Sequence, residues 1–362
     1  MQSLLLKIDK INAIIALPIF FIKQLKKYSL GKEQIMVRYG TIGTGWITDA
    51  FIKGGEMVEG LELAAVYSRE QEKGNQFAHE HGAPLVFTDY KKMAECDDID
   101  AVYIASPNAL HYEQSKLFLQ HGKHVICEKP IAVEPEELME LQSLAEEKNL
   151  IYMEAIMMLH LPQRKILHEA VGRLGKVTTA RFDFSQLSSK YPAFLAGNVP
   201  NIFNPQLATG CLMDLGIYCI YPAVDLFGEP REIATKAGFL SSGADGFDNS
   251  IFIYPDKQVS ISCSKIGQSA IGSEIMGDQG TLLIRSISQL TNITFIGRDG
   301  KEEKLVGGIE KSKLMSGEAQ SFYRYITFPE TYKAEYRENN RLTLLVNRML
   351  KQMRQQAGIV FS

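Results

Sequence analysis

The stretch Val125-Ile126-Cys127-Glu128-Lys129-Pro130 separates two kinds of sequence in this chain. Residues 125–127 form a short apolar run typical of a buried parallel strand, and Pro130 ends the strand because it has no N–H to donate. Glu128 and Lys129 therefore follow a strand's carboxyl end, where ligands bind in open α/β sheets. Taken alone, the pair fits a solvated surface ion pair better, so the rest of the chain decides its meaning.

A glycine-rich turn follows the first expected strand. Residues 37–42 run into Gly43-Thr44-Gly45-Trp46-Ile47-Thr48, after which apolar residues recur at helical spacing. Such glycines let the backbone approach a pyrophosphate, whose charge is met by the N-terminus of the following helix. Thr48 stands where Gly or Ala is usual in this motif.

The second expected strand, residues 61–66, ends in Tyr67-Ser68-Arg69. In a dinucleotide-binding fold, an acidic residue about 20 positions after the glycines holds the ribose 2′-hydroxyl of NAD, whereas an Arg accommodates the 2′-phosphate of NADP. Ser68 and Arg69 therefore favour NADP as the cofactor. NAD stays possible, because Arg69 could be an exposed loop cation.

Strands and helices then alternate, which predicts a doubly wound parallel sheet. The expected elements are residues 70–81, 85–87, 101–105, 110–121, 134–148 and 150–153. The loop Ser106-Pro107-Asn108 follows another strand, so Asn108 either bonds the cofactor or caps the next helix. His111, in the first helical turn, is more often a structural hydrogen-bonding residue than a catalyst.

Beyond Glu154 the pattern changes to the alternation of half-buried antiparallel strands. In residues 178–185, Ala180, Phe182 and Phe184 share one face. Further strands are expected at residues 233–240, 250–254, 259–264, 269–276 and 281–284. Five or six such strands predict an open, mainly antiparallel sheet. A carboxyl-terminal helix is expected at about residues 340–357, with Gly358 ending it.

One helix interrupts these strands, at Gly210-Cys211-Leu212-Met213-Asp214-Leu215-Gly216-Ile217-Tyr218. Asp214 and Tyr218 are four residues apart, so a helix places them on one face. Gly216 costs about 1 kcal/mol relative to Ala, which makes sense where something packs closely against the helix. Each residue also has a structural interpretation, Asp214 as a first-turn acid favoured by the helix dipole and Tyr218 as a core aromatic.

Composition limits the classes of function. The 362 residues are 45% hydrophobic and 22% charged, with a formal net charge of -3, so no basic excess indicates a nucleic-acid partner. The five cysteines show no CxxC pair or metal-type spacing, so no metal site is expected. Their odd number argues against a disulfide framework and favours a reducing, cytoplasmic compartment.

The first 35 residues differ from the rest. Residues 11–22 are almost wholly apolar, yet they are shorter than the ~20 residues that a membrane helix needs. Lysines, rather than a small-residue cleavage site, follow them. We expect translation to begin at Met36, with a peripheral membrane tether or a signal peptide as alternatives. The expected domains are an N-terminal extension (1–35), a dinucleotide-binding domain (36–154) and a domain for substrate binding and oligomerisation (155–362).

Together these motifs resemble the Gfo/Idh/MocA family of nicotinamide-dependent oxidoreductases, over essentially all of residues 36–362. The matching elements are residues 43–47, Ser68-Arg69, Ser106-Pro107-Asn108 with His111, Glu128-Lys129-Pro130, and the segment from Asp214 to Tyr218. The resemblance implies that the first four groups bind the cofactor and that Lys129 lies at the nicotinamide. Tyr218 and Ser68-Arg69 resemble the branch of dimeric dihydrodiol dehydrogenases and NADP-dependent xylose dehydrogenases. Thr209-Gly210-Cys211 departs from the family, where small glycines are commoner.

The implied reaction is hydride transfer between NADP(H) and the carbinol carbon of a sugar, polyol or cyclic diol. Tyr218, with a reference pKa near 10, is a base only if a cation such as Lys129 stabilises its phenolate; alternatively, Lys129 exchanges the proton itself. Asp214 would orient the substrate or the lysine, and Glu128 would support the loop. The competing hypothesis is a non-catalytic dinucleotide sensor, against which the joint presence of Lys129, Asp214 and Tyr218 argues.

The last expectation concerns assembly. The outer face of the second sheet carries the hydroxyl row Ser260, Ser262 and Ser264 instead of charges. Small uncharged side chains allow two sheets to approach closely, and twofold self-contacts are the commonest route to homo-oligomers. We therefore expect a homodimer, or a dimer of dimers, and the family resemblance implies the same.

Overall fold

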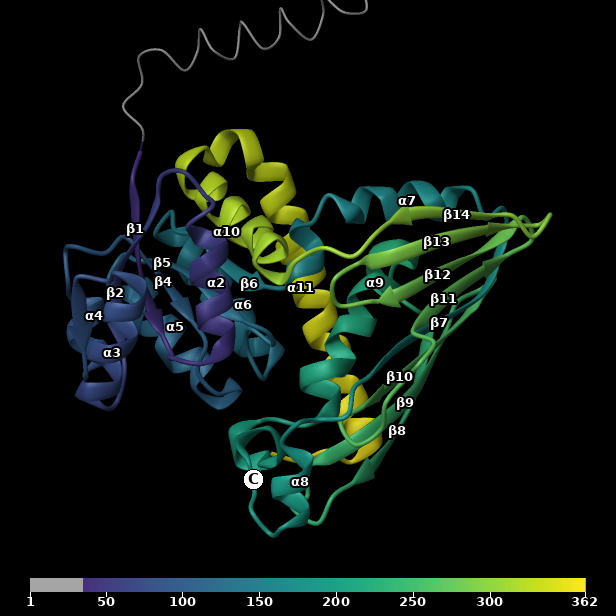
Figure 1. Ribbon diagram of the computed structural model, residues 1–362, viewed down its shortest axis with the longest axis horizontal. Coiled ribbons are helices and arrows are strands. Elements are labelled where there is room, and N and C mark those ends of the chain that lie inside the picture. Colours follow the sequence, from purple (N-terminus) through teal and green to yellow (C-terminus); the bar gives the residue numbers. More distant parts are fainter. Residues whose placement is uncertain (1–34, 362) are drawn as a thin grey trace, which may run out of the picture. The chain divides into compact units, whose positions relative to one another are not determined.

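The first sheet has six strands in the order β3-β2-β1-β4-β5-β6, in a computed structural model that describes residues 35–361 (Figure 1). The expectations for residues 1–34 lie outside the described residues. The elements of this part are β1 (Val37–Ile42), α2 (Trp46–Gly55), β2 (Leu61–Tyr67), α3 (Gln71–His81), β3 (Leu85–Phe87), α4 (Tyr90–Ala94), β4 (Ala101–Ile104), η1 (Asn108–Leu110), α5 (His111–Gln120), β5 (His124–Glu128), α6 (Pro135–Glu147) and β6 (Tyr152–Ala155).

All neighbouring strands of this sheet are parallel, which confirms the doubly wound fold. β4 is buried along its whole length, as the near-continuous apolar sequence of a parallel strand requires. The strand order reverses at β1, and ligands bind at such switch points, outside the carboxyl ends of the strands. Ile42, Ile104 and Cys127 are paired across β1, β4 and β5, so the loops after these strands begin at one edge.

The second sheet has eight strands in the order β14-β13-β12-β11-β7-β10-β9-β8. The elements of this part are η2 (Met157–His160), α7 (Gln163–Gly172), β7 (Val177–Ser185), α8 (Tyr191–Leu195), η3 (Asn201–Phe203), η4 (Pro205–Leu207), η5 (Leu212–Gly216), α9 (Ile217–Phe227), β8 (Glu232–Phe239), β9 (Asp245–Ile253), β10 (Gln258–Ser264), β11 (Ser273–Gly277), β12 (Gly280–Ser286), β13 (Thr291–Gly297) and β14 (Glu302–Val306). Every pair is antiparallel except β7 with β10, which confirms a mainly antiparallel sheet.

The expected number of five or six strands is wrong, because β13 and β14 extend the sheet. β14 is an edge strand whose first three residues are charged and exposed. Charged edges prevent unwanted strand pairing, but they also remove the apolar alternation by which a strand is recognised in sequence.

Two carboxyl-terminal helices follow. α10 (Lys311–Thr327) returns the chain to the first sheet, whereas α11 (Pro329–Ala357) buries Leu342, Val346 and Met353 in the core beneath the second sheet. Leu314 and Phe322 of α10 lie in one buried cluster with Val37 and Phe51. α11 begins at Pro329 and not near residue 340 as expected. The sequence did not reveal the earlier start, because the first turns of the helix are largely exposed and lack apolar residues at helical spacing. Gly358 ends it in the left-handed conformation, as predicted.

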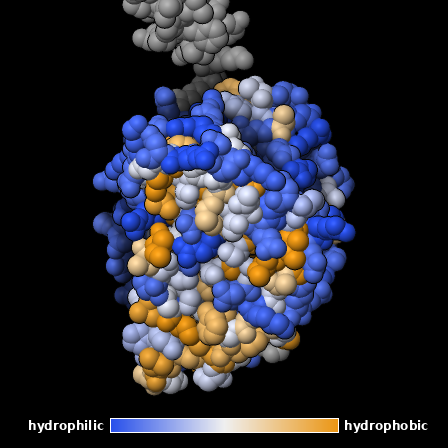
Figure 2. Space-filling model, turned by 90° about the vertical axis from the view of Figure 1, so that its right-hand side faces the viewer, coloured by the Kyte–Doolittle hydropathy of each residue, from blue (hydrophilic) through white to orange (hydrophobic). Residues whose placement is uncertain are grey.

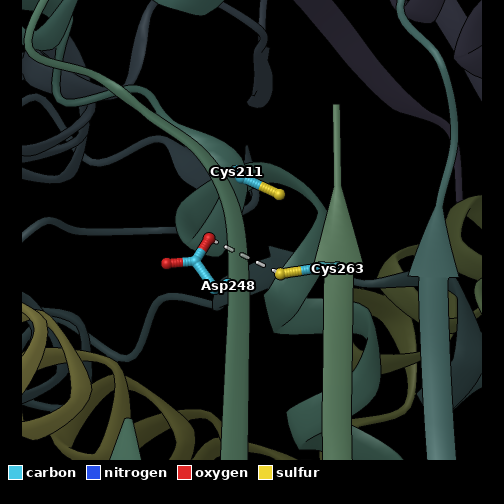
Figure 3. Close-up of side chains that lie close together, drawn as sticks. All are labelled: Cys211, Asp248 and Cys263. Atoms are coloured by element: carbon cyan, nitrogen blue, oxygen red, sulfur yellow. Dashed lines mark hydrogen bonds between the residues drawn. The ribbon is translucent and has the colours of Figure 1, made fainter. Parts of the chain in front are cut away.

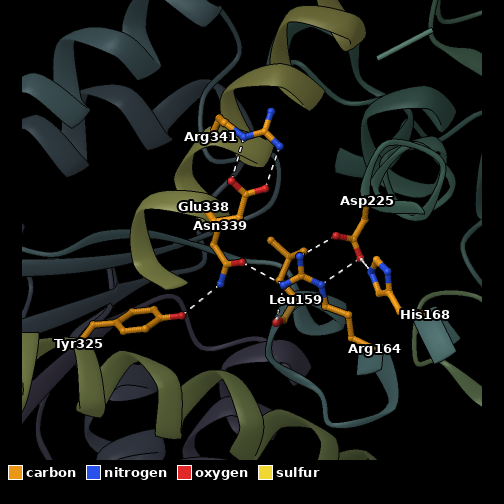
Figure 4. A network of polar contacts seen from close by, with 8 residues as sticks. All are labelled: Leu159, Arg164, His168, Asp225, Tyr325, Glu338, Asn339 and Arg341. Carbon is orange, nitrogen blue, oxygen red and sulfur yellow. Dashed lines mark hydrogen bonds and ion pairs between the residues drawn. The ribbon is translucent and has the colours of Figure 1, made fainter. Parts of the chain in front are cut away.

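A polar network joins α7, α9 and the two carboxyl-terminal helices (Figure 4). Arg164 donates from Nε and Nη2 to Asp225 (2.9 and 2.6 Å) and from Nη1 to Asn339 Oδ1 (3.0 Å). Asn339 Nδ2 then donates to the hydroxyl of Tyr325 (3.1 Å). Bidentate, charge-assisted bonds of this kind fix orientation as well as adding stability, so the network holds α7 and α9 to α10 and α11.

One segment among the described residues, Pro205–Phe227, has the length and apolar composition of a membrane span. In its most apolar window, 78% is buried inside the protein, and the segment includes η5 and α9. It is therefore the central helix of the second core, packed beneath the sheet.

Candidate active site

The glycine turn after β1 has the geometry of a phosphate-binding loop. Gly43 has a φ of +111°, and a Cβ there would lie 2.8 Å from the carbonyl oxygen of Ala105, so only glycine fits. Gly45 is the N-cap of α2, makes no side-chain cap bond, and has no described atom within 4 Å of an added Cβ. Unbonded N–H groups facing open space at a helix N-terminus suit a pyrophosphate. Thr44 and Ile47 are half-buried beside this turn.

The end of β2 presents the residues that the sequence assigns to cofactor choice. Ser68 is buried, and its Oγ accepts from the backbone N–H of Glu70 (3.3 Å). Arg69 is exposed, and none of the ion pairs among the described residues includes it. The Arg69 guanidinium is therefore available for a phosphate. Trp46, in the glycine turn, is exposed as well, and Lys311 Nζ of α10 lies 5.8 Å from its ring centroid.

The loop after β4 contradicts one expectation and clarifies another. Asn108 does not cap a helix, because its Nδ2 donates to the carbonyl oxygen of Ala208 (2.8 Å) and Pro107 is the N-cap of η1. His111 is fully buried, with its ring nitrogens 2.9 Å from Pro130 O and 2.8 Å from Ser106 O. His111 thus connects the loops after β4 and β5.

Lys129, Asp214 and Tyr218 meet at the end of β5. Lys129 Nζ lies 2.6 Å from Asp214 Oδ1, 2.9 Å from the carbonyl oxygen of Asp214, and 4.8 Å from the ring centroid of Tyr218. The side chain of Lys129 is 10% exposed and that of Asp214 is 35% exposed, so the ion pair is partly open to solvent. The structure therefore brings the three expected catalytic residues together.

The helix that carries Asp214 differs from the expected one. Leu212–Gly216 forms a π-helical turn, and α-helical geometry begins only at Ile217. The four-residue spacing argument for Asp214 and Tyr218 therefore used the wrong helix type, although both side chains still reach Lys129. Single π turns within α-helices occur frequently at functional sites.

Two family models match this chain. Residues 37–156 match the oxidoreductase family with an NAD-binding Rossmann fold, and residues 167–283 match the GFO/IDH/MocA C-terminal domain. Scyllo-inositol 2-dehydrogenase (NADP(+)) IolU of Bacillus subtilis (strain 168) is 40% identical over 327 residues, which cover 90% of this chain and 98% of that protein. The chain belongs to the Gfo/Idh/MocA oxidoreductase family.

Two further similarities agree with this assignment. Trans-1,2-dihydrobenzene-1,2-diol dehydrogenase of Xenopus laevis is 29% identical over 275 residues, covering 74% of this chain and 80% of that protein. The 3-ketoreductase KijD10 of Actinomadura kijaniata, in complex with NADP and TDP-benzene, superimposes with a TM-score of 0.76 at 21% identity, covering 89% and 98% of the two chains; this similarity supports the fold alone. The oxidoreductase is thus an enzyme with an NAD(P)-binding Rossmann domain, and the alternative of a non-catalytic sensor is dropped.

Lys265 of this oxidoreductase is a site residue that the sequence reasoning missed. It is 2% exposed, and its Nζ lies 2.9 Å from Asp214 Oδ2 and 3.0 Å from the carbonyl oxygen of Ile202. The sequence did indicate that Lys265 is buried, because it continues the alternation in which every second residue of β10, namely Val259, Ile261 and Cys263, faces the core. A lysine in phase with core residues needs a buried partner, and Asp214 is that partner.

The electrostatics of the site assign a protonation state to each group. Burial opposes the ionisation of Asp214, but Lys129 and Lys265 outweigh it and hold the pKa of Asp214 well below its usual range. For Lys129, burial lowers the pKa, and the neighbouring acidic groups, Asp214 first among them, more than reverse this. Burial raises the pKa of Tyr218 more than Lys129 lowers it. The site therefore holds an ammonium, a carboxylate and a neutral phenol.

Glu128 supports the loop, as the sequence suggested. It is buried, its Oε1 accepts from the hydroxyl of Tyr103 (2.6 Å), and its Oε2 accepts from the backbone N–H of Lys129 (3.3 Å). Glu154, at the end of β6, accepts from the backbone N–H of Ile131 (2.8 Å), and burial raises its pKa to about 7. These two carboxylates fix the backbone on either side of the Lys129–Pro130 bond.

Proposed function

We propose that this oxidoreductase transfers a hydride between NADP(H) and the carbinol or carbonyl carbon of a polyol, sugar or cyclic diol. The observation that carries the proposal is the 2.6 Å contact between Lys129 Nζ and Asp214 Oδ1, at the carboxyl end of β5. The names of the inositol and dihydrodiol dehydrogenases among its relatives support substrates with neighbouring hydroxyl groups. Expected cofactor ligands are the residues of the glycine turn, Ser68-Arg69, and the loops at Asn108 and Glu128.

The proton is assigned to Lys129. When bound, the nicotinamide accepts or gives the hydride. Lys129 donates a proton to the carbonyl oxygen in reduction. In oxidation Lys129 first loses its proton to solvent and then, as the neutral amine, receives the hydroxyl proton, while Asp214 holds its Nζ in place. The ammonium of Lys129 lies over the face of the Tyr218 ring. The Tyr218 hydroxyl makes no hydrogen bond within residues 35–361. We infer that the Tyr218 hydroxyl hydrogen-bonds to a second hydroxyl group of the substrate. His111 has the separate role of positioning the loops after β4 and β5.

The first test removes the charge of Lys129. Lys129→Met should lower turnover by roughly 10²- to 10⁴-fold, because it removes the acid–base group while keeping the side-chain volume. Tyr218→Phe should also lower turnover while leaving the ring under Lys129. Turnover is measured as NADP⁺ reduction with scyllo-inositol, myo-inositol, xylose and a trans-dihydrodiol. For the unaltered enzyme, oxidation should accelerate as pH rises, because it requires neutral Lys129.

Lys116→Met is the matched control, since Lys116 pairs with Glu140 on the surface of α5. This variant should keep normal turnover. NADPH affinity should be nearly unchanged in all three variants. Lys129 does not carry the proton if Lys129→Met keeps near-normal turnover on a substrate that the unaltered enzyme oxidises. The proposed substrate class is rejected if the unaltered enzyme oxidises none of the hydroxylated compounds.

We further propose that the cofactor is preferentially NADP, because exposed Arg69 replaces the acid that would hold a ribose 2′-hydroxyl. Arg69→Ala should weaken NADPH binding about 10- to 100-fold and leave NADH binding almost unchanged, as expected for one lost charge-assisted hydrogen bond. Fluorescence titration gives both dissociation constants. Arg337→Ala, an exposed arginine of α11, is the control. If the unaltered enzyme binds NADPH and NADH with equal affinity, the proposed preference for NADP is wrong.

We propose that two copies pair through the outer face of the second sheet, in a reducing, cytoplasmic setting that suits five free thiols. Apolar and polar residues are mixed on this face (Figure 2). Phe247 and Ile251 of β9 are 44% and 47% exposed, and Ser260 and Ser262 of β10 lie half-exposed beside them. Small and apolar side chains on a sheet face favour close face-to-face contact.

The dimer is tested by placing a charge at its expected centre. Ser262→Lys should shift the mass measured by light scattering toward the monomer, because the new ammonium would be desolvated between the sheets. NADPH affinity should be unchanged. Lys236→Ser, which removes a charge from β8, two strands away from β10, should leave the dimer intact. A monomeric mass of the unaltered enzyme at micromolar concentration would refute the arrangement.

A further inference from the structure

A second cluster of polar side chains lies in the core beside the turn that carries Asp214 (Figure 3). Cys211 directly precedes η5, and Asp248 of β9 and Cys263 of β10 are cross-strand partners. The two sulfur atoms and a carboxylate oxygen all lie within 4.8 Å of one another. Each of the three residues is at most 2% exposed, so the cluster is part of the folded core.

The chemistry of these three side chains is that of metal ligands. Zn²⁺ binds thiolates at about 2.3 Å and carboxylate oxygens at about 2.0–2.2 Å in tetrahedral geometry, which places neighbouring ligand atoms about 3.5–3.8 Å apart. The observed separations require only small side-chain adjustments to reach that spacing. The weak bond that now joins the groups, from Cys263 Sγ to Asp248 Oδ2 (3.7 Å), is readily replaced.

Unpartnered carboxylate oxygens form an independent observation. Asp248 Oδ1 and Asp245 Oδ1 are buried and have no hydrogen-bond partner among the described residues. The other oxygen of Asp245 accepts from the backbone N–H of Leu212 (2.6 Å). A buried acceptor without a donor is costly, and the ammonium of Lys265 is already bound to Asp214. Two carboxyl groups and two thiols therefore lie together in one core region.

The backbone around the cluster is closely fitted to it. A Cβ at Gly210 would overlap Asp245 Oδ1, and a Cβ at Gly216 would lie 3.2 Å from Cys263 Sγ. The latter contact is the close packing that Gly216 predicts from sequence. Glycine at both positions allows the turn with Asp214 to lie directly against the cluster.

We propose that Cys211, Asp248 and Cys263 form a structural binding site for a thiophilic divalent cation, Zn²⁺ above all. Asp245 is the adjacent carboxylate that adds negative charge to the site. The bound cation fixes the start of η5 to β9 and β10, and with it the position of Asp214. Because the site is buried, the cation stabilises the fold and does not contact the substrate.

The experiment uses Co²⁺ as a spectroscopic probe for the Zn²⁺ site. The full-length protein is treated with a chelator and a phosphine reductant, freed of chelator, and titrated with Co²⁺. We expect one equivalent to bind with a thiolate-to-cobalt charge-transfer band in the near ultraviolet. Cys211→Ser and Cys263→Ser should lose this band. Cys127→Ser, a buried thiol in the first sheet, and Cys96→Ser should keep it.

Carboxylate variants and thermal unfolding give readouts that do not depend on the thiol variants folding. Asp245→Asn keeps an acceptor for the N–H of Leu212 and should weaken cobalt binding about 10- to 100-fold, as expected for a residue outside the ligand set. Zn²⁺ should raise the unfolding temperature of the unaltered protein and of Cys127→Ser, but not of Asp248→Asn. The site is refuted if the unaltered protein shows no charge-transfer band, or if the band survives in both Cys211→Ser and Cys263→Ser.

Discussion

The carboxylate of Asp214 lies between two ammonium groups, Lys129 Nζ at 2.6 Å and Lys265 Nζ at 2.9 Å. This contact joins β5 of the first sheet to β10 of the second, so it fixes the geometry between the nucleotide-binding edge and the second domain. Burying a lysine without a counter-charge costs several kcal/mol or forces the amine to become neutral. Asp214 therefore holds Lys129 charged, and the chemistry proposed for Lys129 depends on it.

The surrounding fold holds these groups in place. β5 ends at Glu128, which leaves Lys129 at the sheet edge where β1 and β4 also end. His111 connects the loops after β4 and β5 through two backbone carbonyl oxygens. On the other side, η5 carries Asp214 and packs against Cys263 through Gly216. The site is thus built from loops and one irregular turn, each supported by a regular strand or helix beneath it.

Local patterns in the sequence predicted the parallel sheet and the strand ends, and the family resemblance implied that Lys129 meets Asp214 and Tyr218. They failed where the outcome depends on distant residues. The alternative that Asn108 caps a helix is wrong, because its amide donates to the carbonyl oxygen of Ala208, which is 100 residues away in sequence. Strand β14 was missed because a charged edge strand has no apolar alternation. Cys211 and Cys263 lie far apart in the chain, so their proximity follows only from the packing of η5 on β10.

The central claim is that Asp214 keeps Lys129 protonated, and the direct measurement is the ionisation of Lys129 by NMR with ¹⁵N-labelled lysine, assigned with Lys129→Met. Burial alone would lower the pKa of Lys129 below its reference value of roughly 10.4, and Asp214 reverses this. In the unaltered protein the Lys129 signal should therefore stay that of an ammonium up to pH values above this reference. In Asp214→Asn it should titrate at lower pH, because burial then dominates. A Lys129 that titrates near neutrality in the unaltered protein, or identically in both proteins, would contradict the account.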